Sequence, residues 1–112
     1  MEEPYSPPPL KIELPFTPES VLQVLEWGVN PAIAPCSHKD IAEWCDRFWC
    51  QYIDIDGPPE IERLLSLLTT VETQWDLYLI NTYSMVELRA LDLDTIQIPT
   101  EWFKEWLNQA KA

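Results

Sequence analysis

Three cysteines and one histidine are the residues in this chain whose chemistry could hold a zinc ion. Cys36, His38, Cys45 and Cys50 fall within one stretch of the sequence, and thiolates and imidazoles are the ligands that zinc prefers. A small zinc-binding module is therefore one hypothesis. The spacing argues against it, because Cys45 and Cys50 stand five positions apart on a predicted helix, about 140° from each other around its axis. The alternative places Cys45 in the core, Cys36 and Cys50 in less buried positions, and His38 exposed near a helix start.

An acidic turn raises the separate question of calcium. Asp54, Asp56 and Gly57 resemble part of a calcium-binding loop, in which the sixth position is an invariant glycine. With Gly57 in that position, Arg63 occupies the twelfth, where a bidentate glutamate is required. The segment is therefore better explained as an acidic turn between two helices.

Catalytic signatures are equally weak. His38 is the single histidine, and a triad would need Cys36, two positions away, as its nucleophile. Gly28 and Gly57 are the two glycines of the chain, so no glycine-rich phosphate-binding loop can be written. We expect a protein that is not an enzyme and that needs no cofactor.

The charge of the chain narrows the class of partner. The sequence has 19 acidic residues against 7 basic ones, for a formal net charge of -12. Such a surface repels nucleic acid and anionic membranes, and there is no apolar run of the roughly 18 residues that a spanning helix needs. The odd cysteine count suits a reducing compartment, and the N-terminal residues do not resemble a secretory signal. We expect a cytoplasmic protein whose partner is another protein. One form of this hypothesis gives that partner a basic surface.

Six tryptophans supply the candidate contact residues, since indole is a favoured anchor of protein interfaces. Trp44, Trp49 and Trp75 fall on helix faces that the spacing predicts to be core. The remaining three tryptophans lie near helix ends and, with one phenylalanine, form the predicted partner-binding set: Trp27, Trp102, Phe103 and Trp106. The alternative is that the terminal helix packs on its own domain, as short helices and large apolar patches usually require.

The elements that must position these side chains are mostly helical. Apolar residues recur at helical spacing over about 18–27, 38–52, 60–80, 85–91 and 100–110. Thr17, Ser37 and Ser84 stand where capping residues are expected, and Thr100 is predicted to cap the last helix. Residues 11–16 and 93–98 alternate polar and apolar side chains, which is typical either of two short paired strands or, for 11–16, of an extended segment laid on the core.

The sequence therefore predicts a mainly α single-domain bundle of four or five helices, with or without a minor two-stranded element. A proline-rich arm occupies residues 1–16, and the helical domain occupies residues 17–112. The favoured function is that of an acidic accessory or adaptor protein that binds another protein. The alternative is an inhibitor or immunity-type protein that blocks the basic cleft of a nuclease or another nucleic-acid-binding protein. The sequence leaves the oligomeric state open.

Overall fold

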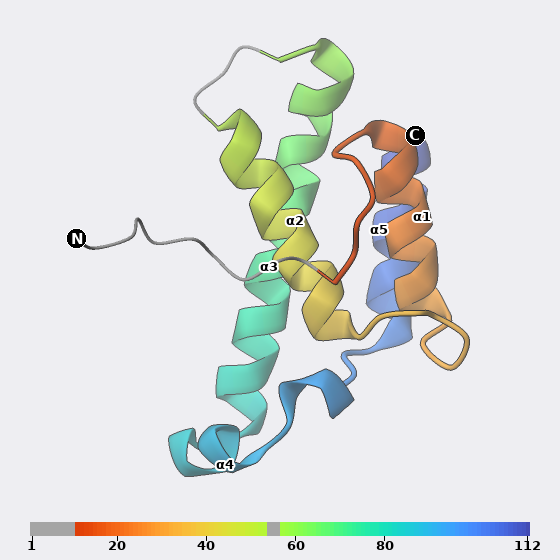
Figure 1. Cartoon of the computed structure of the whole chain (residues 1–112). Helices are drawn as coiled ribbons and strands as arrows, with labels where there is room; N and C mark the ends of the chain where they lie inside the picture. The colour runs from red at the N-terminus through yellow and green to blue at the C-terminus, as the bar shows by residue number, and fades with distance from the viewer. Residues whose placement is uncertain (1–10, 54–56) are drawn as a thin grey trace, which may run out of the picture.

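The structure is a computed structural model that describes residues 11–53 and 57–112. Within these ranges the chain forms one compact all-α domain (Figure 1). Its elements are α1 (Pro18–Val29), α2 (His38–Tyr52), α3 (Pro59–Thr82), α4 (Met85–Ala90), the short 3₁₀ helix η1 (Leu93–Thr95) and α5 (Thr100–Lys111). The mainly α prediction is confirmed. Residues 1–10 of the proline-rich arm and the two aspartates of the supposed calcium loop lie outside the described residues.

Three of the helix starts follow from the capping residues in the sequence. The Thr17 hydroxyl accepts a hydrogen bond from the backbone N–H of Ser20 at 3.3 Å. Ser37 forms a capping box with Asp40, and Ser84 forms a second one with the glutamate three positions on. Each box satisfies backbone N–H groups that the first turn of a helix leaves unpaired.

The start of α5 differs from the prediction. Pro99 occupies the capping position and Thr100 is the first helical residue, so the helix begins without a side-chain cap. The threonine hydroxyl therefore does not perform the capping role that the sequence suggested. The stability of α5 depends instead on what its apolar face packs against.

The core lies between two pairs of helices, α1 with α5 and α2 with α3 (Figure 1). Trp44, Phe48 and Phe103 are its largest fully buried side chains. The Trp44 and Phe48 rings meet edge to face with centroids 5.5 Å apart. Trp75 is also buried, as predicted, whereas Trp49 packs against the core while remaining half-buried.

Residues 11–16 do not form a strand, and no strand occurs among the residues that the structure describes. The segment lies extended against the core, with Ile12 buried, and the Trp44 indole N–H donates to the Leu14 carbonyl at 3.2 Å. The predicted two-stranded element is therefore not seen. The segment that we predicted as the end of an arm is, from residue 11 onward, part of the folded body.

Residues 92–98 also lack the predicted strand, because local hydrogen bonds turn the chain into η1. The backbone N–H of Asp94 and the hydroxyl of Thr95 donate to Asp92 at 3.0 and 2.7 Å. The alternation that suggested a strand has another cause, since Ile96 and Ile98 are both buried in the core. An extended segment with one buried face produces the same period of two as a strand.

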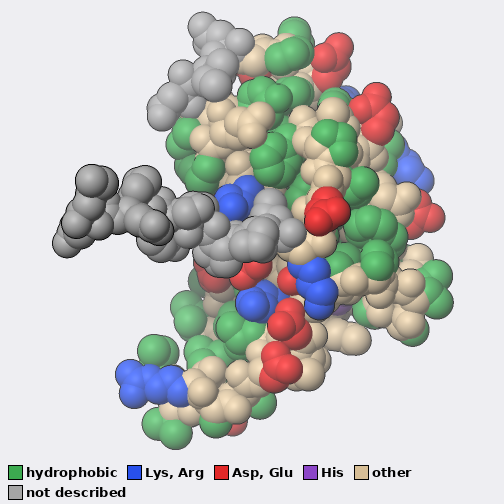
Figure 2. All heavy atoms as spheres, in the orientation of Figure 1, with side chains coloured by type: hydrophobic (Ala, Val, Ile, Leu, Met, Phe, Trp, Pro, Cys, Tyr) green, Lys and Arg blue, Asp and Glu red, His purple; other side chains and the backbone are tan. Residues whose placement is uncertain are grey.

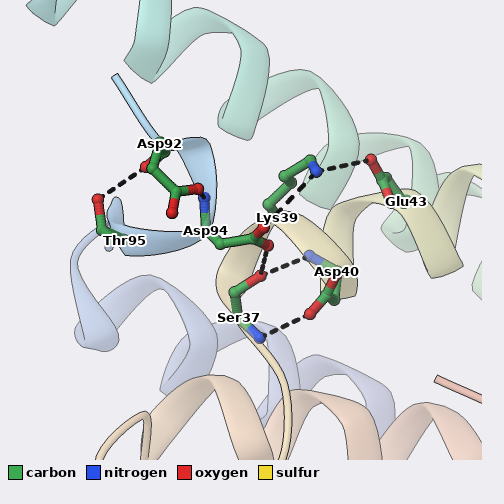
Figure 3. A network of polar contacts seen from close by, with 7 residues as sticks. All are labelled: Ser37, Lys39, Asp40, Glu43, Asp92, Asp94 and Thr95. Atoms are coloured by element: carbon green, nitrogen blue, oxygen red, sulfur yellow. Dashed lines mark hydrogen bonds and ion pairs between the residues drawn. The ribbon is translucent and has the colours of Figure 1, made fainter. Parts of the chain in front are cut away.

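Polar contacts attach η1 to the start of α2 (Figure 3). The Ser37 hydroxyl donates to Asp94 at 2.8 Å and accepts from the backbone N–H of Asp40 at 3.1 Å. Lys39 lies 3.9 Å from Asp94 and 3.7 Å from Glu43. The cap of α2 thus also holds a segment almost sixty residues further along the chain.

The far end of α5 is held by α3. Arg63 donates from its guanidinium to the backbone carbonyls of Ala110 and Ala112, where the helix dipole is negative and favours a cation. No described helix combines the length and the apolar character required to cross a membrane.

Candidate protein-binding surface

Two of the four predicted partner anchors are buried within the domain. Phe103 is fully buried and Trp106 is 6% exposed, because the apolar face of α5 packs against α1. The Phe103 ring centroid lies 5.0 Å from that of Trp106 and 4.4 Å from that of His38. Neither side chain is an exposed anchor. For these two residues the structure agrees with the alternative, in which α5 packs on its own domain.

The other two predicted anchors, Trp27 and Trp102, are half-buried and line two different surface hollows. Trp27 lines a hollow of about 250 Å³ together with Ile12 and Cys36. Trp102 lines a groove of about 400 Å³ that also contains Gln74 of α3. No residue lines both hollows. The two half-buried members of the predicted partner-binding set therefore lie in different hollows.

The supposed zinc ligands are also kept apart by the fold. Cys45 is buried and Cys50 is exposed, while Cys36 is intermediate. Burial raises the pKa of the Cys36 thiol to about 11 and raises the pKa of Cys45 as well, and a raised pKa disfavours the thiolate that binds metal. Among the described residues no three histidine, cysteine or acidic side chains are grouped as metal ligands would be. The fold therefore does not assemble the zinc-ligand set that the sequence suggested.

His38 is buried, not exposed as we expected, and both of its ring nitrogens are occupied. Its Nε2 lies 3.0 Å from the carbonyl oxygen of Gly28, and its Nδ1 accepts from the backbone N–H of Ile98 at 3.0 Å. Because a carbonyl can only accept, the hydrogen must be on Nε2 and the ring must be neutral. The histidine thus joins the end of α1 to the segment before α5.

The environment of His38 disfavours its charged form. Burial lowers its pKa from the ordinary value of 6.5, and the hydrogen bond to Gly28 opposes that shift only in part. A second proton would have to be added at Nδ1, where it would face the N–H of Ile98. The residue is therefore a structural link with no free nitrogen for acid–base chemistry.

Four carboxylates lie along the junction of α2 and α3. Glu43, Asp46, Glu72 and Asp76 line a hollow of about 240 Å³, together with Lys39. Burial raises the pKa of Glu72, and its hydrogen bond with Asp76 and the charges of Asp76 and Asp46 raise it further. This crowding makes the groove a concentrated part of the acidic surface.

An exposed apolar surface lies at the end of the molecule where α3 meets α4. Among the described residues seven large hydrophobic side chains are exposed, and five of them fall between positions 77 and 91. We call these five the distal patch: Leu77, Ile80, Met85, Val86 and Leu91. Figure 2 shows hydrophobic side chains at the surface of the lower end of the molecule, interspersed with other side chains, where Figure 1 places α4.

The sequence interpretation missed the distal patch although a signal for it was present. At 100° per residue, Leu77 lies about 160° around the axis of α3 from the buried Leu79. Ile80 lies about 140° from the buried Trp75. Apolar residues so far from the core face of a helix cannot share its burial. The exposure of Met85 and Val86 was harder to predict, because apolar residues on a short helix are equally consistent with burial in the core.

No known protein family matches the sequence, and no curated protein or solved structure matches the chain. Any function must therefore be inferred from the residues themselves.

Proposed function

We propose that this is a non-enzymatic accessory protein that acts by binding another protein, and that the distal patch is its principal contact surface. The observation that carries the proposal is the concentration of exposed large hydrophobic side chains in residues 77–91. Scattered exposed apolar residues are normal on a soluble domain, whereas a gathered set marks an interaction surface.

The form of α4 supports this assignment. The helix has six residues and none of them is buried. Two of its apolar side chains are strongly exposed, Val86 at 76% and Met85 at 64%. A helix this short is unstable by itself, yet the Ser84 capping box, with hydrogen bonds of 3.1 and 3.2 Å, fixes its first turn. The apolar side chains are therefore presented on a pre-formed element, which lowers the entropy cost of binding.

The state of the Cys36–His38 pair supports a non-enzymatic role. Cys36 and His38 line the same hollow, but burial raises the pKa of the thiol to about 11. Both nitrogens of His38 are occupied by backbone groups. A cysteine–histidine pair would need a lowered thiol pKa and a free ring nitrogen.

A capture experiment with tagged full-length protein tests the proposal. The wild type is compared with the double variant Ile80→Ser/Val86→Ser and with Ile33→Ser, a matched control in which an exposed isoleucine outside the patch is replaced. We expect the wild type and Ile33→Ser to capture a partner protein and to retain it at about 1 M salt, where the Debye length is roughly 3 Å. The double variant should fail to capture that protein. Identical capture by all three proteins would contradict the role of the patch.

The same experiment distinguishes the alternative function. An inhibitor that occupies a basic cleft through the carboxylates of α2 and α3 would bind mainly by charge, so its capture would be lost at high salt. That loss would be the same for the wild type, the double variant and the control. Trp27 and Trp102 remain predictions as additional contacts, because both rings are partly accessible.

A further inference from the structure

The charged residues beside the distal patch are almost all acidic. Residues 72–94, which contain the patch, carry five acids, Glu72, Asp76, Glu87, Asp92 and Asp94, and one base, Arg89. The chain as a whole has a formal net charge of -12. A partner that covers the apolar side chains must therefore also meet a negative surrounding surface.

This charge disfavours a second copy of the chain as the occupant of the patch. In a symmetric dimer the same surface appears on both sides of the interface, so the acids of one copy would face the acids of the other. Like charges placed opposite each other cost several kcal/mol at an interface. Asp94 has Lys39 beside it at 3.9 Å, but one arginine in each copy cannot neutralise the other four acids.

We infer that the distal patch binds an amphipathic segment of a different protein, in which apolar side chains are flanked by lysine or arginine. This inference rests on the proposed function and specifies the partner's chemistry. Leu77 and Ile80 stand three residues apart on one face of α3, and Met85 adds a flexible side chain that can adapt to an apolar partner. The acids beside them supply the complement for the basic flanks.

A defined peptide provides the direct test. A labelled helical peptide of about 18 residues, roughly five turns, carries leucine on one face and lysine on the other, and a matched peptide carries glutamate in place of lysine. Fluorescence anisotropy measures the affinity of each peptide for the wild type, for Ile80→Ser/Val86→Ser and for Ile33→Ser. All the replaced side chains are exposed, and circular dichroism checks that each variant is folded.

We expect the lysine peptide to bind the wild type and Ile33→Ser equally, and the double variant about tenfold more weakly or worse, since central apolar anchors carry most of the binding energy. The glutamate peptide should not bind. Equal binding of the lysine peptide to all three proteins would overturn the inference, because charge alone would then account for it. Binding of the glutamate peptide through the patch would overturn it as well.

Two further outcomes separate this inference from the proposed function. If sedimentation shows a wild-type dimer at micromolar concentration that Ile80→Ser/Val86→Ser abolishes, the occupant is a second copy and the inference is wrong. If capture from cells depends on the patch but the captured surface is not basic, the proposed function stands and the inference fails. If capture does not depend on the patch, the surface assigned in the proposed function fails.

Discussion

Replacing Gly28 with alanine should destabilise the domain, because α1 and α5 meet there without room for a side chain. A Cβ added at Gly28 would lie 2.2 Å from Cδ1 of Phe103 and 2.5 Å from its Cγ. These separations are far below ordinary contact between carbon atoms. The Phe103 ring cannot easily move away, since it is fully buried between His38 and Trp106.

Two opposing effects set the size of the loss. Overpacking a core costs about 1 to 3 kcal/mol and occasionally more, and a clash with a fully buried ring belongs at the upper end. Alanine recovers up to about 1 kcal/mol through its better helix propensity, since Gly28 lies within α1. We therefore expect Gly28→Ala to lower the free energy of unfolding by about 2 kcal/mol, which is roughly 8 °C in Tm for a domain of this size.

Urea unfolding followed by circular dichroism measures this loss, and Gly57→Ala is the matched control. A Cβ at Gly57 would come no closer than 3.4 Å to Tyr52, so that variant should be unchanged or slightly more stable. In Gly28→Ala/Phe103→Leu the smaller side chain should relieve part of the clash and give non-additive losses. The reasoning is refuted if Gly28→Ala is as stable as the wild type or more stable.

Three other predictions test the core and its single histidine. Trp44→Ala should cost about 3 to 5 kcal/mol in urea unfolding because the indole is fully buried, and a loss below about 1 kcal/mol would contradict that placement. Cys45→Ser should lower the free energy of unfolding by about 1 to 3 kcal/mol, because it buries a hydroxyl without a partner. Cys50→Ser, at an exposed site, should change it by no more than about 0.5 kcal/mol. Equal losses in the two variants would contradict the difference in burial. The NMR signal of His38 should titrate with a pKa below 6.5; because the folded state binds the proton more weakly than the unfolded one, the associated stability is full above that pH and is lost as the pH falls through the folded pKa. A pKa at or above 6.5 would refute the buried, neutral ring.

Local patterns were sufficient to predict most helices. The capping box of Ser37 and Asp40 correctly predicted the start of α2. The three- and four-residue spacing of apolar residues correctly predicted that Trp44 and Phe48 lie in the core. These features depend on residues within one or two turns of each other, so a single sequence contains the information.

The features that were mispredicted or left open depend on residues far apart in the chain. His38 follows a helix cap, where an exposed polar residue is usual, but its two hydrogen bonds reach residues 10 and 60 positions away. Phe103 on a short amphipathic helix reads the same whether it docks on a partner or on its own domain. The deciding feature is Gly28, whose missing side chain lets the ring approach α1. Ile96 and Ile98 were assigned to a strand because the period of two cannot reveal that a pairing partner is missing.

The pairing of α1 with α5 has a consequence for how the protein is made. Val29 and Thr100 are separated by 71 positions, so at roughly 5 to 20 residues per second a ribosome needs about 4 to 14 s to progress from the end of α1 to the start of α5. During that time the face of α1 that α5 will cover lacks its partner helix. The nascent chain must therefore carry this face of α1 without its partner helix until α5 has been made, and chaperones that bind such surfaces have their best opportunity before residue 100 emerges.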